Sequence, residues 1–299
     1  MKPLVAVDWG TSSLRAALLD SEGRVLEEHA SARGILTVPS GQFAAVLMAE
    51  NAPWMRAAGA FFLLSGMVGS RQGWLEAPYC PCPGGFTEIS SQLAWVEPDR
   101  IAIVPGMSCE EHGVPDVMRG EETQVFGAMG LLGIDAGLFV LPGTHSKWVS
   151  VNNGRIERFS TFMTGEFYAL LRKHSILART MPEADGELDE GAFRKGLAQA
   201  RKSANLLNAA FSARTLSLFD RMSAASLPSY LSGLIIGEEL RSQQLDIPKQ
   251  PVVIIGANAL TQRYEIALAD RGVASRRVGS EATWRGLWAI ARTLQGEQP

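Results

Sequence analysis

Short apolar runs alternate with amphipathic segments along the chain, and turns rich in glycine and proline separate them. Continuous apolar runs are typical of buried strands, whereas apolar residues three and four positions apart indicate helices. The pattern predicts helices that begin near Gly120, after residue 259 and at Ala282. Strands are predicted at residues 5–9, 14–19, 24–30, 60–64, 101–104, 139–141, 148–151 and 252–255.

Residues 165–177 and 190–245 are predicted to be mainly helical. Within the second span, Gly233 and Gly237 lie four residues apart, a spacing that favours close packing of one helix face. Residues 78–85 are rich in proline and glycine, and we expect them to be irregular.

One motif occurs twice: an apolar strand runs into Gly-Thr-x-Ser at residues 5–13 (VAVDWGTSS) and again at residues 139–146 (FVLPGTHS). Apolar residues resume after each motif, which predicts a strand, a tight turn and a second strand. Glycine lets a ligand approach the backbone, and neighbouring hydroxyl and N–H groups form an anion-binding concavity. Asp8, just before the first turn, supplies the carboxylate that Mg²⁺ bridging phosphates requires.

Either turn alone is also explained by ordinary hairpin chemistry. The pair of turns, with Asp8 on one of them, favours a polyphosphate clamp. The Gly-Lys-Ser/Thr pattern of a P-loop is absent from the sequence. A further glycine-rich loop, at residues 66–74, follows the carboxyl end of a predicted strand. Open α/β sheets place their ligands at this end of their strands. We expect this loop to face the substrate.

A length of 299 residues and an apolar fraction of 46% predict about two domains, with the boundary in residues 130–137. No membrane span or signal-peptide pattern is recognised, so a cytoplasmic location is expected. A net charge of −3 without a basic run argues against a nucleic-acid partner. The three cysteines are expected to be reduced, and a single Cys-x-Cys pair gives little support to a zinc site.

The segments VDWGTSSLRAAL, MRGEETQVFGAM, LPGTHSKWV and VVIIGANAL resemble, in order and spacing, the phosphate-1, connect-1, phosphate-2 and adenosine motifs of the actin-like ATPase superfamily. That superfamily includes hexokinase, glycerol kinase and actin. Within it, GMVGSRQGWLEAPY, VMRGEETQ and LPGTHSKWV resemble the 2-dehydro-3-deoxygalactonokinase family, and the similarity spans nearly the whole chain.

The resemblance implies an α/β fold of two ribonuclease-H-like domains, residues 1–134 and 135–299, with mixed five-stranded sheets around a central nucleotide cleft. It implies ATP and Mg²⁺ as cofactors and transfer of the γ-phosphate to the 6-hydroxyl of a small-molecule sugar acid, 2-dehydro-3-deoxy-D-galactonate. Asp8 is assigned to Mg²⁺. The residues assigned to the ATP phosphates are Gly10, Thr11, Ser12 and Ser13 in the first turn and Gly143, Thr144, His145 and Ser146 in the second.

For the catalytic base, glycerol-kinase-like enzymes place a carboxylate after glycine at the start of the helix that precedes phosphate-2. Glu121 holds that position here and is the first choice, although the family motif commonly carries Asp there. Glu122 lies beside it, and the choice between the two stays open. For Glu122 we favour the alternative that an acidic residue in the first turn only stabilises the helix dipole.

A carboxylate substrate needs a cation, and Arg71 and Arg119 are the candidates, although each also fits an exposed charge or a structural ion pair. Ser70 and Trp74 are candidate substrate contacts, and for Trp74 packing is the commoner role. Lys147 either reaches a phosphate or alternates outward along its strand. The sequence offers His145 no acid/base partner.

For adenosine, Gly256, Ala257 and Asn258 are assigned, and Gly279 with less support, because glycine permits close approach and asparagine bonds ribose or base. Two other functions compete with the kinase assignment: a kinase of another sugar or sugar acid, and an ATP-driven switch that phosphorylates no small molecule. A non-catalytic sugar sensor is a third alternative, which Asp8 and the acidic pair argue against. Family members form dimers in some cases, and no stripe of this sequence demonstrates a homodimer.

Overall fold

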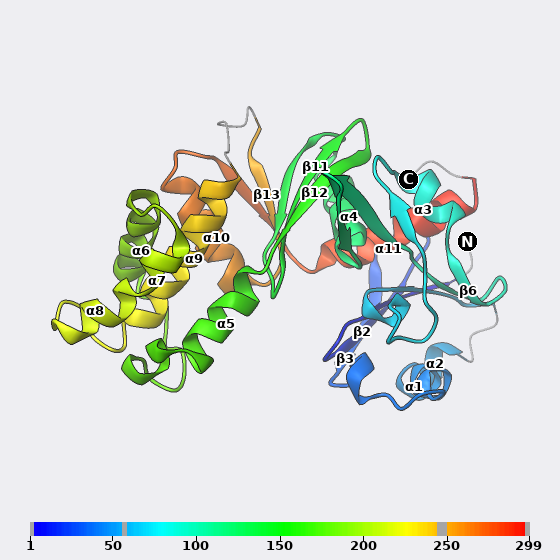
Figure 1. The fold of residues 1–299 in the computed structure, drawn as a ribbon. Helices are drawn as coiled ribbons and strands as arrows, with labels where there is room; N and C mark the ends of the chain where they lie inside the picture. Colours follow the sequence, from blue (N-terminus) through cyan, green and yellow to red (C-terminus); the bar gives the residue numbers. More distant parts are fainter. Residues whose placement is uncertain (1–2, 56–58, 244–249, 297–299) are drawn as a thin grey trace. The chain divides into compact units, whose positions relative to one another are not determined.

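The computed structural model describes residues 3–55, 59–243 and 250–296, which belong to two compact units (Figure 1). The first unit contains Met1–Phe139, Val149–Ser160 and Val278–Pro299, and the second contains Val140–Trp148 and Thr161–Arg277. The C-terminal helix is therefore part of the first unit, although it follows the second in sequence. The division into domains 1–134 and 135–299 stays a prediction.

The first unit is built on a six-stranded sheet in the order β3-β2-β1-β4-β7-β6. β1 is antiparallel to β2 and parallel to β4, so the sheet is mixed, as predicted. One strand more than the expected five is present because β6 returns antiparallel to β7 at the edge. The strands are β1 (Leu4–Trp9), β2 (Leu14–Leu19), β3 (Val25–Ser31), β4 (Phe61–Ser65), β6 (Ala94–Glu97) and β7 (Ile101–Ile103).

Helices cover this sheet because β1 and β4 are apolar at almost every position and need burial on both faces. α4 and α11 lie side by side in Figure 1 and cross where both backbones carry glycine. A Cβ added at Gly127 would lie 1.7 Å from the carbonyl oxygen of Ala282, and one at Gly286 would lie 1.9 Å from that of Thr123. The helices are α1 (Phe43–Glu50), α2 (Ala52–Met55), α3 (Phe86–Ser91), α4 (Glu121–Leu132) and α11 (Glu281–Leu294), with 3-10 turns η1 (Ile35–Thr37) and η2 (Met67–Gly69).

A three-stranded sheet in the order β5-β8-β9 corrects the expectation that residues 78–85 are irregular. β5 (Tyr79–Pro81) pairs with β8 (Gly106–Glu111), which forms a hairpin with β9 (Val114–Met118). Pro81 is tolerated because β5 is an edge strand, where a residue without an N–H group need not complete a ladder. The strand was not predicted because proline-rich segments are typical of loops.

A five-stranded sheet follows in the order β12-β11-β10-β13-β14. Its strands are β10 (Gly137–Leu141), β11 (Ser146–Asn152), β12 (Arg155–Phe162), β13 (Val252–Ile255) and β14 (Ser275–Val278). The predicted strands at residues 139–141, 148–151 and 252–255 are confirmed, and β12 and β14 were not predicted.

The second unit carries most of the helices, and the span predicted over 190–245 contains four of them; residues 244 and 245 lie outside the described chain. Gly233 and Gly237 pack closely, as their spacing predicted: a Cβ at Gly233 would lie 2.0 Å from the carbonyl oxygen of Phe193 on the neighbouring helix. No helix within the described residues is long and apolar enough to cross a membrane. The helices are α5 (Thr164–His174), the 3-10 turn η3 (Ile176–Thr180), α6 (Glu190–Lys202), α7 (Leu206–Ala210), α8 (Ser212–Leu218), α9 (Leu227–Ser242) and α10 (Asn258–Ala269).

Candidate functional site

The first Gly-Thr-x-Ser turn connects β1 and β2 and exposes its hydroxyl groups. The N–H of Gly10 donates to the carbonyl of Ser13 at 2.9 Å, which closes the turn, and residues 11–13 are exposed. The backbone of Gly34 packs closely against the turn: a Cβ at Gly34 would lie 2.3 Å from the carbonyl oxygen of Thr11. Such a turn offers hydroxyl and N–H groups to an anion.

Two glycines bring the first turn of α4 to the carboxyl ends of β1 and β4. Gly66 and Gly120 adopt φ angles of 94° and 103°, which side chains rarely allow. A Cβ at Gly66 would lie 3.3 Å from Oδ1 of Asp8, and a Cβ at Gly120 would lie 3.2 Å from the Cα of Gly66. Asp8 and the Glu121-Glu122 pair are therefore gathered at one edge of the sheet.

The two glutamates at this edge have different environments. Glu122 is fully buried, and its carboxyl oxygens accept the N–H of Gly120 at 2.9 and 2.7 Å. Burial, helped by the charge of Glu121, raises the pKa of Glu122 to about 8. Glu121 is partly exposed, and its Oε2 accepts the N–H of Arg119 at 2.9 Å. Glu122 is thus enclosed at the start of α4, whereas Glu121 is partly exposed.

Asp8 forms an ion pair with Arg15, which stands directly opposite it on β2. The guanidinium of Arg15 also lies 5.6 Å from the ring centroid of Trp284 in α11. Sequence reasoning missed Arg15. The predicted hairpin could have indicated this ion pair, because positions 8 and 15 face each other across the turn of an antiparallel hairpin.

The structure separates the four candidate substrate contacts. Arg119 is buried; its Nη2 donates to the carbonyl of Ala77 at 2.8 Å, while Nε and Nη1 have no hydrogen-bond partner among the described residues. The hydroxyl of Ser70 is likewise buried and unpaired there. Arg71 is 87% exposed and faces Glu76 at 3.4 Å, and Trp74 stacks on Phe43. Arg119 and Ser70 thus have unused hydrogen-bonding capacity, whereas Arg71 and Trp74 fit the structural alternatives.

In the second turn, between β10 and β11, Thr144 and His145 are exposed and the two following side chains are buried. Ser146 donates its hydroxyl to Glu239 at 2.7 Å, and Nζ of Lys147 lies 2.6 Å from Oγ1 of Thr161. Of the two alternatives for Lys147, outward alternation along its strand does not hold, because β11 is buried from Ser146 to Val149.

His145 has a carboxylate partner that the sequence did not reveal. Its Nε2 lies 2.6 Å from Oε2 of Glu166, in the first turn of α5. That turn contacts the loop directly: the N–H of Glu166 donates to the carbonyl of Thr144 at 2.9 Å, and a Cβ at Gly165 would lie 2.4 Å from the carbonyl oxygen of Gly143. The expectation that His145 has no acid/base partner was wrong, because the partner comes from a later helix.

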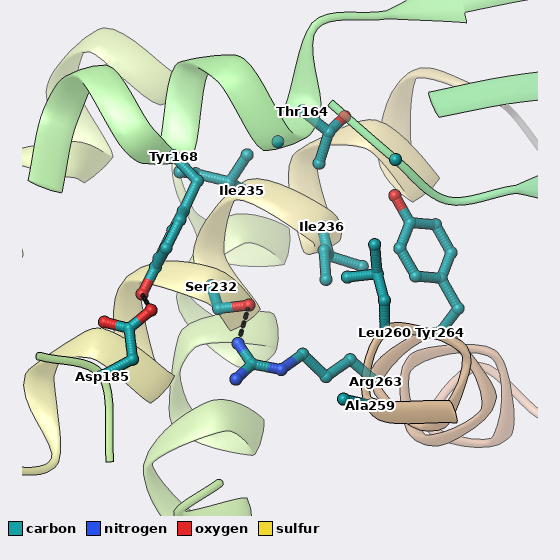
Figure 2. Close-up of a pocket in the computed structure, with 12 residues that line it drawn as sticks. Thr164, Tyr168, Asp185, Ser232, Ile235, Ile236, Ala259, Leu260, Arg263 and Tyr264 are labelled. Atoms are coloured by element: carbon teal, nitrogen blue, oxygen red, sulfur yellow. Dashed lines mark hydrogen bonds between the residues drawn. The ribbon is translucent and has the colours of Figure 1, made fainter. Parts of the chain in front are cut away.

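A cavity of about 250 Å³ opens beside Gly143 (Figure 2). At one side Tyr168 donates to Asp185 at 3.1 Å and Arg263 donates to Ser232 at 2.7 Å. Burial raises the pKa of Tyr168 to about 12. Sequence reasoning did not identify these residues: Tyr168, Ser232 and Arg263 come from three separate helices, and Asp185 comes from the segment between η3 and α6. The cavity is lined by Gly143, Thr164, Gly165, Tyr168, Asp185, Ser232, Ile235, Ile236, Ala259, Leu260, Arg263 and Tyr264.

The predicted adenosine turn lies between β13 and α10, immediately before two residues that line the cavity. Gly256 has a φ of 144°, and Ala257 and Asn258 are exposed. Gly279 belongs to the first unit, where its N–H donates to Oε1 of Glu281 at 3.0 Å.

A family model described as 2-keto-3-deoxy-galactonokinase matches residues 8–290. The chain belongs to this kinase family. It is 38% identical to a probable 2-dehydro-3-deoxygalactonokinase of Rhizobium meliloti over 97% of this chain and 96% of the relative. It is 34% identical to the 2-dehydro-3-deoxygalactonokinase of Escherichia coli, over 97% and 98% of the two chains.

Solved structures agree with this membership of the 2-keto-3-deoxy-galactonokinase family. The crystal structure of a putative 2-dehydro-3-deoxygalactonokinase from Sinorhizobium meliloti superposes with a TM-score of 0.89, at 37% identity, over 98% of this chain and 99% of that one. The (R)-2-hydroxyglutaryl-CoA dehydratase component A of Acidaminococcus fermentans, 15% identical over 99% of both chains, shares the fold with a TM-score of 0.53. The predicted fold class and family are confirmed.

Among the described residues of this kinase-family chain, no group of three or more His, Cys, Asp or Glu side chains could hold a metal ion. Mg²⁺ in phosphoryl-transfer sites usually takes one or two carboxylates, with water and phosphate oxygens completing its shell. The partly exposed carboxylate of Asp8 fits that requirement.

Proposed function

We propose that this protein transfers the γ-phosphate of ATP to the 6-hydroxyl of 2-dehydro-3-deoxy-D-galactonate. The observation that carries the proposal is the family membership, with relatives named for this activity covered over nearly their whole length. The gathering of Asp8 and Glu121 at one sheet edge by Gly66 and Gly120 supports it.

Glu121 is proposed as the catalytic base. It takes the proton of the 6-hydroxyl while that oxygen bonds to the γ-phosphorus and the bond to the β–γ bridging oxygen breaks, which leaves ADP. Its partial exposure supports this role, whereas Glu122 is buried and bonded to Gly120. We therefore assign Glu122 to hold the start of α4 through its hydrogen bonds to Gly120; its raised pKa favours the uncharged form near neutral pH, which argues against a role in stabilising the helix dipole.

ATP is proposed to bind through the two Gly-Thr-x-Ser turns and the cavity beside Gly143. Residues 11–13, 144 and 145 are exposed and Gly10 and Gly143 are partly exposed, so the backbone and hydroxyl groups of both turns are suited to phosphate. The largely apolar cavity between α9 and α10 is suited to adenosine, and residues 256–258 lie directly before it. For Ser146 and Lys147 a supporting role is favoured, and a contact of Gly279 with adenosine stays a prediction.

Mg²⁺ would be held by Asp8 and would neutralise charge on the phosphates. Arg15, already paired with Asp8, adds a second positive charge at the same carboxylate. Arg119 is proposed to bind the carboxylate of the sugar acid, because a buried guanidinium with unpaired N–H groups favours an anionic acceptor. Gly69 and Ala77 cover its side chain, so we expect residues 66–77 to shift when the substrate binds. A homodimer and a cytoplasmic location stay predictions.

The test is ADP release from Mg-ATP with 2-keto-3-deoxy sugar acids, including the galactonate and gluconate epimers, and with hexoses, glycerol and no acceptor as controls. We expect turnover selective for the galactonate, with phosphorus-coupled NMR placing the new ester at carbon 6. Turnover on a different acceptor would change the assigned substrate and leave the assigned fold unchanged. Slow ATP hydrolysis at the same rate with every acceptor and with none would contradict the kinase assignment and favour a nucleotide switch.

A further inference from the structure

A single buried carboxylate joins the separate segments of the second unit that surround its cavity. Glu239, in α9, is 3% exposed. Its Oε1 accepts the hydroxyl of Ser146 at 2.7 Å and the indole N–H of Trp148 at 2.6 Å. Its Oε2 accepts the hydroxyl of Tyr264 at 2.6 Å and that of Thr164. One side chain therefore binds β11, the start of α5 and α10 at once.

The arrangement of donors favours a carboxylate over an amide at this position. All four partners are hydroxyl or indole groups that donate, and each carboxyl oxygen accepts two of them. Burial works against the charge and raises the pKa of Glu239, whereas the four donors favour the ionised form. Removing the acceptor would leave several buried donors without partners, which is costly.

Three of the four donors belong to the proposed nucleotide site. Ser146 ends the second Gly-Thr-x-Ser turn, and Thr164 and Tyr264 line the cavity. Figure 2 shows Thr164 and Tyr264 on the side of the cavity away from Tyr168 and Asp185. Thr164 also precedes Gly165, whose backbone packs against the turn at Gly143. A change at Glu239 would therefore displace the turn and the cavity wall together.

We propose that Glu239 is a positioning residue for nucleotide binding, which holds the second phosphate turn, the start of α5 and α10 in the arrangement that accepts ATP. This inference rests on the proposed function, because it takes the turn and the cavity to be the nucleotide site. Glu239 itself does not line the cavity, so its effect passes through Ser146, Thr164 and Tyr264.

The test compares Glu239→Gln with Glu238→Gln in the full-length protein. Glutamine matches glutamate in size, but its NH₂ group meets donors that need an acceptor. Glu238 immediately precedes Glu239 in the same helix, is paired with Arg241, and makes no contact with the Glu239 donors among the described hydrogen bonds. The probe is the Mg²⁺ complex of a non-hydrolysable ATP analogue, measured by calorimetry, with KM for ATP and for the sugar acid measured separately.

For Glu239→Gln we expect the Kd of the analogue and the KM for ATP to rise about tenfold or more, with KM for the sugar acid within about twofold. Glu238→Gln should bind like the wild type. If Glu239→Gln does not fold, Tyr264→Phe removes one donor and should raise the Kd about three- to tenfold. A folded Glu239→Gln or Tyr264→Phe that binds the analogue like the wild type would overturn the inference, as would equal losses for both substrates. Failure of the wild type to bind the analogue would instead reject the proposed nucleotide site itself.

Discussion

Glu122 makes the stability of the first unit depend on pH, because the folded protein holds a proton that the unfolded chain releases. The side chain is fully buried at the start of α4, and its pKa is raised from 4.5 to about 8 by burial and by Glu121. Between these two values the folded state binds more protons than the unfolded state, so the free energy of unfolding falls as pH rises. This contribution is fully present below pH 4.5 and is lost as pH passes through about 8.

The magnitude follows from the difference between the two pKa values. One unit corresponds to about 1.4 kcal/mol, so the contribution of Glu122 should fall by about 3 to 4 kcal/mol between about pH 5 and about pH 8. Glu122→Gln mimics the protonated side chain and keeps an oxygen to accept the N–H of Gly120. Its stability should lie within about 1 kcal/mol of the wild type at the acidic end, and it should be the more stable protein at the basic end.

Urea unfolding followed by tryptophan fluorescence measures this difference, because six of the seven tryptophans lie in the first unit. Subtracting the variant from the wild type at each pH removes the titration of other groups, Glu239 included. Glu281→Gln is the matched control, since Glu281 is an exposed carboxylate in the first turn of α11. A difference between wild type and Glu122→Gln that is flat from pH 5 to 8 would refute the reasoning and show that Glu122 is ionised throughout.

Three further predictions test the site and the helix packing. Glu121→Gln should lower kcat about 10²- to 10⁴-fold with nearly unchanged nucleotide affinity, and a near-normal kcat in steady-state assays would reject it as the base. Arg119→Lys, in a folded protein, should raise KM for the sugar acid about tenfold or more, whereas Arg71→Lys should change this KM less than about twofold. A larger rise in KM for Arg71→Lys than for Arg119→Lys would show that Arg71 binds the substrate carboxylate. Gly127→Ala should destabilise the first unit by about 3 kcal/mol in urea unfolding, because its Cβ meets a backbone oxygen at 1.7 Å. Gly130→Ala, in the same helix with only ordinary contacts to Arg285, should stabilise it by about 0.5 to 1 kcal/mol, and equal effects at the two sites would contradict the close crossing.

The sequence was informative where the signal is local. The hairpin at residues 5–19, the helix after Gly120 and the close packing of Gly233 each depend on neighbouring residues or on a helical repeat, and the structure confirms them. The strand at Tyr79–Pro81 was missed because its partner is more than twenty residues away and its own composition indicates a loop. The fold class was predicted from the family resemblance, because local patterns alone did not determine it.

The chemistry of the site was less predictable, because the deciding contacts join distant residues. Glu166 lies 21 residues from His145, and Glu239 lies 93 residues from Ser146. Neither spacing follows a helix or strand period, so no pattern in the sequence pairs them. The choice between Glu121 and Glu122 depended in the same way on burial, which the folded structure reveals and adjacent positions in a sequence do not.

The two Gly-Thr-x-Ser turns show how one motif can place its hydroxyl groups differently. In the first turn Ser13 is exposed and Gly34 supports the backbone from below, so the hydroxyl groups stay available to a ligand. In the second turn Ser146 is buried and donates to Glu239, which leaves the exposed Thr144 and His145 to meet a ligand. The hydroxyl of Ser13 is therefore open to a ligand, whereas the hydroxyl of Ser146 already donates to a buried acceptor. Substituting Ser146 should consequently disturb nucleotide binding through the position of the turn, rather than through the loss of a direct phosphate contact.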